Sequence, residues 1–174
     1  MTSQALHTIG YEGSSIGDFL ATLEAVRIKL LIDVRDVPIS RKPGFSKSAL
    51  ARSLAMHGIE YLHLKGLGDP KPGRIAARDG RYKDFRRIFA AHLRSVIAQA
   101  DMIRGIEAAS NKTACLLCFE RDHRYCHRGL VAKEMACRGG FGLVHLCVQP
   151  GLTKKSALGR KCIHDGAHAL VGQH

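Results

Sequence analysis

Thiol, carboxylate, imidazole and guanidinium groups come close together about two thirds of the way along this chain of 174 residues. Glu120 follows Cys118 by two positions, and Cys126, His127 and Arg128 then stand side by side. A thiol beside a histidine and an arginine at the start of a helix has a lowered pKa, which makes it a better nucleophile or ligand. Glu120 could transfer protons as a general acid or base, or only favour the helix dipole. Both cysteines could equally be structural groups.

A second set of polar side chains follows apolar segments nearer the N-terminus. Asp33 ends an apolar run and could act as a general base, orient one, or tie down a neighbouring group. The guanidinium of Arg35 can bind a phosphate or carboxylate through two parallel hydrogen bonds, or pair with Asp33. Further candidates for substrate binding are Ser40 and Arg41. Tyr11, which follows an earlier apolar run, is another.

One familiar phosphate-binding pattern fits this sequence poorly. Cys118 and Arg124 have the spacing found in the phosphate loop of cysteine-dependent phosphatases. Here the intervening residues include no glycine, and two of them are acids that would face the anion. Tyr125 also replaces the hydroxyl residue that usually follows the arginine. We therefore interpret the match as a coincidence of spacing.

A metal site is the next alternative. Zinc ligands could be drawn from Cys115, Cys118, Cys126 and His127 or Cys137. Cys115 and Cys118, however, would point to opposite faces if both lie on one strand, and no second pair of closely spaced cysteines follows. We assign no metal ligand and leave the cofactor unknown, although a catalytic metal held by cysteine, histidine and glutamate stays an alternative.

The scaffold for these residues can be predicted from the apolar pattern. Five short apolar runs, typical of strands, occur at residues 6–9, 30–34, 59–64, 113–119 and 143–148. Helical periodicity lies between them, beginning near Ser15, Ser46, Tyr82 and Leu130. We expect the third helix to continue to Ile97 and residues 65–81 to form a long polar connection. The alternation predicts a three-layer α/β/α sandwich with a mostly parallel, Rossmann-like sheet of about five strands.

This scaffold would bring the polar candidates together. In open α/β sheets, ligands bind beyond the carboxyl ends of the strands. Tyr11, Asp33 with Arg35, and Cys118 with Glu120 each stand at or just after the end of a predicted strand. Because the strands are parallel, these ends lie at one edge of the sheet, and we expect the site there.

The length fits one domain, since domains commonly contain about 100–200 residues. We expect a single α/β domain over residues 1–150 and a basic, loosely ordered C-terminal tail over residues 151–174, where large apolar residues become scarce. No apolar run approaches the ~20 residues of a membrane span, and the N-terminus lacks the pattern of a signal peptide. Six cysteines without a secretory signal are typical of a reduced, cytoplasmic protein.

Positive charge is concentrated in two segments of the chain. The sequence has 27 Lys and Arg against 15 Asp and Glu, a formal net charge of +12. Residues 35–47 hold four basic residues and one acidic residue, and residues 65–87 hold eight basic and three acidic residues. Both segments follow predicted strands, so their charge would gather beside the same edge of the sheet. Concentrated charge of one sign favours an anionic ligand.

Several motifs occur in order along the chain. They are Thr8-Ile9-Gly10-Tyr11-Glu12-Gly13, Asp33-Val34-Arg35, Pro38, Ser40-Arg41-Lys42-Pro43-Gly44-Phe45-Ser46, Gly58-Ile59-Glu60-Tyr61, His63-Leu64, Leu67-Gly68, Leu117-Cys118-Phe119-Glu120 and Cys126-His127-Arg128. In combination they resemble the domain of unknown function 488 family over roughly residues 6–148. The resemblance implies a three-layer α/β fold in one compact domain and supplies no activity. The recurrent polar positions of that family correspond here to Asp33, Arg35, Ser40, Arg41, Cys118, Glu120, Cys126, His127 and Arg128.

The first functional hypothesis is an enzyme, a hydrolase or group transferase, that acts on a phosphorylated or nucleotide-like anion. Catalysis would draw on Cys118, Glu120, Cys126, His127 and Asp33, and substrate binding on Arg35, Ser40, Arg41, Arg128 and Tyr11. The alternatives are a non-catalytic module that binds nucleotides or nucleic acid, and a thiol redox protein that pairs Cys118 with Cys126. Aromatic residues are only 6% of the chain, so surfaces that stack on bases are scarce. No membrane partner is expected.

Overall fold

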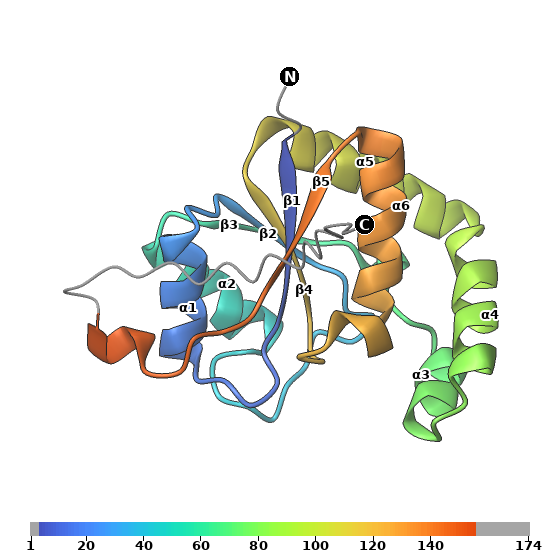
Figure 1. Ribbon diagram of the computed structural model, residues 1–174, viewed down its shortest axis with the longest axis horizontal. Coiled ribbons are helices and arrows are strands. Elements are labelled where there is room, and N and C mark those ends of the chain that lie inside the picture. The colour runs from blue at the N-terminus through green and yellow to red at the C-terminus, as the bar shows by residue number, and fades with distance from the viewer. Residues whose placement is uncertain (1–3, 156–174) are drawn as a thin grey trace, which may run out of the picture.

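The computed structural model describes residues 4–155, which form an α/β fold around one five-stranded sheet (Figure 1). The strand order is β3-β2-β4-β1-β5, and every neighbouring pair is parallel. The strands are β1 (Ala5–Gly10), β2 (Leu30–Asp33), β3 (Glu60–His63), β4 (Ala114–Cys118) and β5 (Gly142–Leu146). The predicted parallel sheet of five strands is therefore confirmed.

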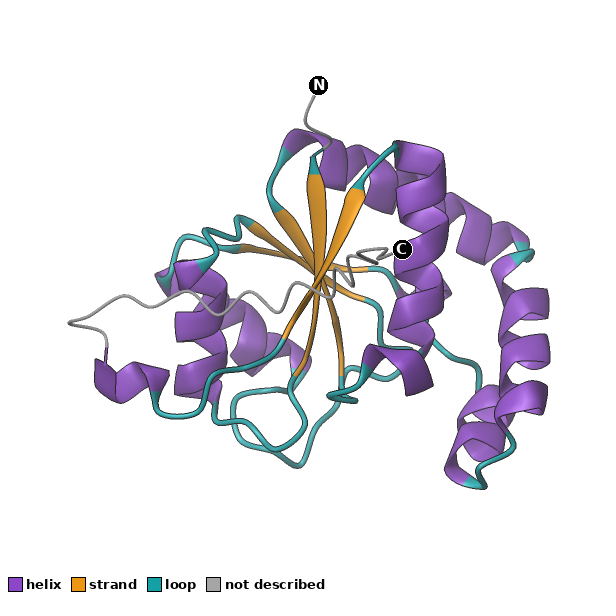
Figure 2. Cartoon of the chain, in the orientation of Figure 1, coloured by secondary structure: helices purple, strands orange, loops and turns teal. Residues whose placement is uncertain are grey.

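Helices lie on both sides of the sheet (Figure 2). They are α1 (Ile16–Ala25), α2 (Lys47–Met56), α3 (Lys71–Arg78), α4 (Tyr82–Leu93), α5 (Val96–Asn111) and α6 (His127–Gly139). Helices α1 and α2 lie on one side, and α5 and α6 lie on the other (Figure 1). Three short 3₁₀ turns complete the described elements: η1 (Lys65–Leu67), η2 (His123–Tyr125) and η3 (Leu152–Lys155). Within residues 4–155, none of these helices is long and apolar enough to cross a lipid bilayer.

Alternating side chains of the central strands supply two separate apolar cores. In β4, Leu116 packs into the core under α4, α5 and α6, whereas Cys115 and Leu117 pack into the core under α1 and α2. Successive side chains of a strand point to opposite faces, so a strand covered on both faces must be apolar throughout. This explains why the sequence shows continuous apolar runs rather than alternation.

Two predictions about the middle of the chain are wrong. Residues 65–81 are not an extended polar connection, because they contain η1 and α3. The helix expected from Tyr82 to Ile97 is interrupted: α4 ends at Leu93, and Ser95 caps α5 by accepting a hydrogen bond from the backbone N–H of Ala98. Val96 and Ile97 are 86% and 69% exposed, so they do not continue the apolar face of α4. Their spacing continues the helical pattern of α4 across the break, which explains why the sequence predicted a single helix.

The predicted boundary near residue 150 falls before η3. Residues 151–155 lie against α1, where the Asp18 carboxylate accepts hydrogen bonds from the backbone N–H groups of Gly151 and Thr153, both at 3.0 Å. Most of the tail predicted for residues 151–174 lies outside the described residues.

Candidate functional site

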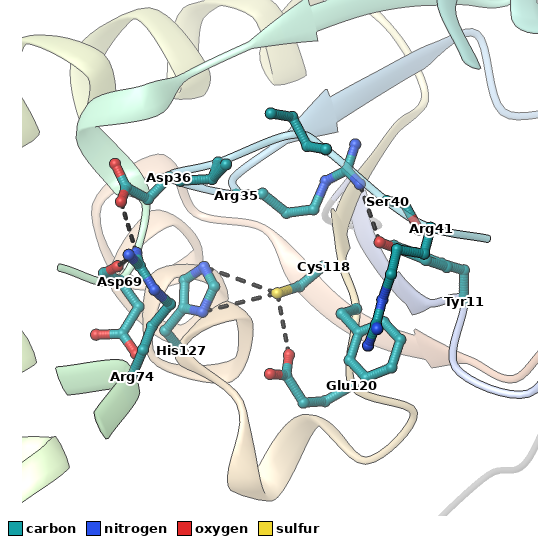
Figure 3. A pocket seen from close by; sticks show the side chains of 13 residues that line it. Tyr11, Arg35, Asp36, Ser40, Arg41, Asp69, Arg74, Cys118, Glu120 and His127 are labelled. Atoms are coloured by element: carbon teal, nitrogen blue, oxygen red, sulfur yellow. Dashed lines mark hydrogen bonds and ion pairs between the residues drawn. The ribbon is translucent and has the colours of Figure 1, made fainter. Parts of the chain in front are cut away.

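The carboxyl ends of β1, β2 and β4 lie at one edge of the sheet, and the loops that follow them enclose a cavity of about 290 Å³ (Figure 3). Parallel strands place their carboxyl ends together, which is why three distant segments meet here. Seven of the residues singled out in the sequence line this cavity: Tyr11, Arg35, Ser40, Arg41, Cys118, Glu120 and His127.

Cys118 ends β4 on the floor of the cavity, between an acid and an imidazole. Its Sγ lies 3.1 Å from Oε2 of Glu120 and 3.7 Å from Nδ1 of His127. The Nε2 atom of His127 is 2.7 Å from the backbone oxygen of Val34 and donates a hydrogen bond to it. That bond holds the ring in place, with both of its nitrogens within 3.9 Å of the sulfur and Phe89 packed edge-on against it.

Burial and close packing change the acidity of these groups. Burial alone would raise the pKa of the Cys118 thiol, but its contacts with Cys126 and His127 outweigh burial and hold that pKa well below its ordinary value. Burial would lower the pKa of His127, and the neighbouring Cys118 instead raises it to about 9. Burial and Cys118 together raise the pKa of Glu120 to about 7. Without a bound ligand, the geometry favours a thiolate beside an imidazolium.

Cys126 lies behind this floor and does not line the cavity. It is the N-cap of α6, and its Sγ accepts a hydrogen bond from the backbone N–H of Arg128 at 3.4 Å. The same sulfur lies 3.0 Å from Oε2 of Glu120. Burial and the neighbouring Cys118 raise the pKa of Cys126 well above its ordinary value. The two sulfurs lie within 4.8 Å of each other and are not bonded.

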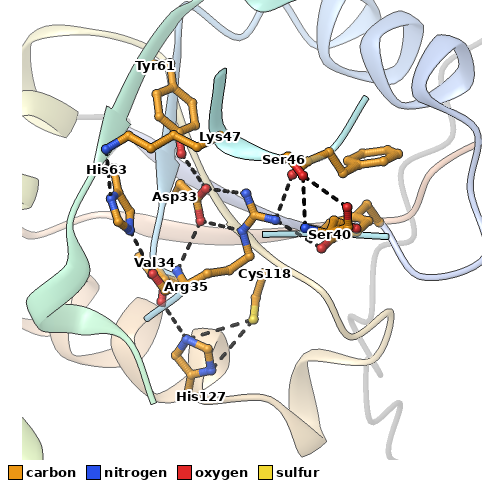
Figure 4. Close-up of polar contacts among 12 residues, drawn as sticks. Asp33, Val34, Arg35, Ser40, Ser46, Lys47, Tyr61, His63, Cys118 and His127 are labelled. Atoms are coloured by element: carbon orange, nitrogen blue, oxygen red, sulfur yellow. Dashed lines mark hydrogen bonds and ion pairs between the residues drawn. The ribbon is translucent and has the colours of Figure 1, made fainter. Parts of the chain in front are cut away.

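Asp33 is fully buried and acts on Arg35 instead of on the cavity (Figure 4). Its Oδ1 accepts a hydrogen bond from Arg35 Nε at 2.8 Å, and its Oδ2 accepts one from the Tyr61 hydroxyl at 2.6 Å. Arg35 Nη1 donates to the Tyr11 hydroxyl at 3.0 Å and to the backbone oxygen of Phe45 at 2.9 Å. Asp33 therefore positions Arg35, and little of that guanidinium is left for a ligand.

Arg128 is buried and shapes the loop after β4. Its Nη1 donates to the backbone oxygen of Glu120 at 2.8 Å, Nη2 donates to that of Arg121 at 3.3 Å, and Nε donates to Thr8 Oγ1 at 3.2 Å. It is not part of the cavity wall. The arrangement places Arg128 as a support that holds Glu120 in position.

Arg41 is the cavity cation with the most freedom. It is exposed and, among residues 4–155, forms no ion pair or hydrogen bond through its side chain. Ser40 lies next to it, and its hydroxyl oxygen accepts a hydrogen bond from the backbone N–H of Lys42 at 3.1 Å. These two residues can reorient toward an anion without breaking an existing ion pair.

Two further cavity residues escaped the sequence analysis. Asp69 is 5% exposed, and its Oδ1 has no hydrogen-bond partner among the described residues. Burial raises the pKa of Asp69 to about 6. Arg74 pairs with Asp36 at 2.5 Å across the cavity wall. Both follow β3, so the strand-end rule would have found them if the segment after that strand had been expected to fold back.

The positions of Arg124 and Cys115 exclude two arrangements that the sequence analysis considered. Arg124 is exposed, pairs with Asp122 at 2.7 Å and does not line the cavity, so residues 118–124 form no phosphate loop around an anion. Cys115 is buried in the core on the opposite face from Cys118. The argument against a zinc site that contains Cys115 therefore holds, but it does not apply to Cys118, Glu120, Cys126 and His127, whose ligand atoms do converge.

Comparison with known proteins gives one match. The model of the family described as Domain of unknown function DUF488 matches residues 15–135. No curated protein and no solved structure matches the chain. The matched region contains every residue of the cavity wall except Tyr11.

Proposed function

Since the chain belongs to the family described as Domain of unknown function DUF488, we propose its function from the cavity itself. We propose that the chain is a hydrolase or group transferase that acts on a small anionic substrate, phosphorylated or nucleotide-like. The observation that carries this proposal is one cavity in which Cys118, Glu120 and His127 share a wall with Arg41, which has no ion-pair partner among residues 4–155. At about 290 Å³ its size is near that of common small-molecule sites, which begin at roughly 300 Å³.

Arg41 and Ser40 would hold the anion. An arginine fork binds phosphate or carboxylate through two hydrogen bonds, and Arg41 is free to do so. Arg35 adds positive charge behind them, but its hydrogen-bonding groups are mostly used by Asp33, Tyr11 and Phe45. The anion is therefore expected near Arg41, at the open side of the floor.

The mouth of the cavity is apolar and suits an uncharged part of the substrate. Val37, Ile39 and Phe119 line it and are all exposed, with Ile39 at 75%. Exposed apolar side chains at the rim of a cavity commonly mark a ligand surface. A nucleotide fits this arrangement, because its charged group could lie near Arg41 and its flat base at the apolar mouth.

Asp69 is the group best placed to exchange a proton with the substrate away from the cluster. It lines the cavity, but its Oδ1 is buried beside Gly73 without a partner among the described residues, so a bound hydroxyl or amine would have to reach the other carboxyl oxygen. A carboxyl with a pKa of about 6 can both accept and donate protons near neutral pH. The attacking group is assigned to the cluster of Cys118, Glu120 and His127.

Binding and turnover test the proposal separately. The full-length protein is titrated with inorganic phosphate and adenosine monophosphate, and a panel of phosphomonoesters and nucleotides is screened for turnover. We expect Arg41→Ala to weaken binding at least tenfold, since it removes a charge-assisted contact worth about 1.5–3 kcal/mol. Arg52→Ala, which removes an exposed charge from α2 outside the cavity, should bind as the wild type does. If both substitutions weakened anion binding equally, the effect would come from the loss of net positive charge alone, and the assignment of this cavity as the anion site would be contradicted.

A nucleic-acid binding module is the second candidate, favoured by exposed basic side chains on α3 and α4. Arg78, Lys83 and Arg86 are exposed there and form no ion pair among the described residues. Binding through the phosphate backbone would weaken steeply as salt rises, and substituting these three residues with alanine would flatten that dependence. A salt-independent affinity for oligonucleotides would exclude this mode.

A further inference from the structure

Four side chains with metal-binding atoms converge where β4 ends and α6 begins. Cys118 and Glu120 come from the end of β4 and the loop after it, Cys126 is the N-cap of α6, and His127 is its first residue. One sulfur, nitrogen or oxygen atom from each lies within 4.8 Å of the other three. Three of the four residues are buried, and Glu120 is half-buried at the cavity floor.

The separations match those of a tetrahedral ion shell. Zinc bonds of about 2.3 Å to sulfur and about 2.0 Å to nitrogen or oxygen place neighbouring ligand atoms roughly 3.5 Å apart. Nδ1 of His127 lies 3.7 Å from Sγ of Cys118 and 3.9 Å from Sγ of Cys126. Oε2 of Glu120 lies 3.1 Å and 3.0 Å from the same two sulfurs. Small movements would bring all four atoms onto one ion.

The histidine is already oriented as metal-binding histidines are. Its Nε2 donates to the backbone oxygen of Val34, which leaves Nδ1 as the ring nitrogen available to an ion, near both sulfurs. Metal-bound histidines almost always donate their other ring N–H to a carbonyl or carboxylate in this way. The backbone N–H of Arg128 supports the Cys126 sulfur from the far side. Both contacts lie outside the four ligands and fix their direction.

From this geometry we propose that Cys118, Glu120, Cys126 and His127 bind one zinc ion. Two thiolates and an imidazole select zinc over magnesium or calcium, which require oxygen ligands. The ion would border the cavity through Cys118, Glu120 and His127. Catalytic zinc sites keep one position for water or substrate, and Glu120, the least buried ligand, is the one that gives way. Only this last role rests on the proposed function; zinc binding does not need a substrate.

Metal analysis of the full chain tests the site. The protein is loaded with zinc, desalted and measured for metal content; we expect about one zinc per chain. Cys126→Ser and His127→Gln should lose that zinc, whereas Cys137→Ser, which removes an exposed thiol from the same helix α6, should keep it. The sequence after residue 160 also contains a cysteine and histidines. Zinc that survives both site substitutions would therefore be bound elsewhere, and the proposal would be wrong.

A second measurement needs no substitution. Wild-type protein is treated with a chelator and alkylated with iodoacetamide with and without added zinc, and each cysteine is read by peptide mass spectrometry. Zinc should protect Cys118 and Cys126 and leave Cys137 and Cys147 unchanged. Equal labelling with and without zinc would overturn the proposal. Arg41→Ala should retain full zinc protection, so that a failure of anion binding and a failure of zinc binding are told apart.

Discussion

At the scale of single residues, the pair formed by Asp33 and Arg35 is the most deeply buried ion pair among the described residues. Removing one partner of a buried pair leaves an uncompensated charge and costs about 3–5 kcal/mol. We therefore expect Asp33→Ala to lower the free energy of unfolding by about that amount, measured by urea denaturation. Asp33→Asn keeps one acceptor oxygen, for either Arg35 or Tyr61, and fills the same space, so it should cost less than Asp33→Ala.

The matched control is an exposed pair. Asp79→Ala removes the partner of Arg81 at the surface and should change the free energy of unfolding by less than about 1 kcal/mol. If Asp33 were instead a catalytic base, Asp33→Ala would abolish turnover in a protein of nearly unchanged stability. That outcome would contradict the positioning role assigned to Asp33.

Single residues at the site were predicted from one rule, that ligands bind where parallel strands end. The rule located Cys118 and Glu120, because both directly follow an apolar run that could only be a buried strand. The rule could not distinguish residues that line the cavity from residues that hold the lining residues in place. Arg128 and Cys126 stand beside His127 in the sequence, but the first turn of α6 directs only His127 into the cavity.

At the scale of elements, the end of β1 packs tightly against the loop that follows β4 where the site begins. Gly10 pairs with Cys118 in register, and a Cβ at Gly10 would collide with the backbone carbonyl of Glu120. Gly10→Ala should therefore push the loop after β4 outward, cost about 1–3 kcal/mol of stability, and weaken phosphate binding. Titration with inorganic phosphate and urea denaturation measure the two effects.

Gly58→Ala is the control for this substitution. Gly58 has a φ of 64° with open space where a Cβ would be placed, so alanine there meets only backbone strain, about 1–2 kcal/mol. It should destabilise the protein comparably and leave phosphate binding unchanged. Unchanged phosphate binding in Gly10→Ala would show that the close approach of β1 does not shape the site.

Elements with a strong apolar pattern were predictable, and those without one were not. The helices that begin after Ser15 and Ser46 have a capping residue followed by buried apolar positions. Helix α3 buries only Gly73 and Ala76, so its sequence reads as a polar loop. Its N-terminal turn nevertheless carries Arg74 to the cavity, which explains why the sequence analysis missed this side of the wall.

At the scale of the whole molecule, His145 couples folding to pH. Burial and the neighbouring His123 lower the pKa of His145 to about 4, and the Thr8 hydroxyl lies 2.8 Å from its Nδ1. The unfolded chain, with a histidine pKa near 6.5, then binds more protons between pH 6.5 and 4. Stability from this group is present above pH 6.5 and is lost as the pH falls toward 4.

The size of this effect is about 1–2 kcal/mol after allowance for the partial exposure of the ring. Urea denaturation at pH 7 and pH 5 should show a smaller loss for His145→Gln than for the wild type. The comparison between the two proteins removes the contributions of other titrating groups, such as Glu120 and Asp69. An identical loss of stability in both proteins would show that the pKa of His145 does not differ between the folded and the unfolded chain.

The distribution of charge in the sequence predicted the cavity wall only in part. The two basic segments do lie near the carboxyl edge, but of their arginines and lysines only Arg35, Arg41 and Arg74 line the cavity. Most of the remaining charge lies on α3, on α4 and between them, where Arg81 pairs with Asp79 and Asp84. Composition counts charges without pairing them, so only the structure reveals that Arg41 is unpaired among residues 4–155.

Protection of Cys118 by an anion tests the central claim most directly. Chelator-treated, full-length protein is alkylated with iodoacetamide, and the labelling rate of each cysteine is read by peptide mass spectrometry with and without adenosine monophosphate. If the cavity is the substrate site, the nucleotide slows labelling of Cys118 in the wild type, does so poorly in Arg41→Ala, and leaves the exposed Cys137 unchanged. Labelling of Cys118 at the same rate with and without saturating nucleotide would contradict the assignment of this cavity as an anion site.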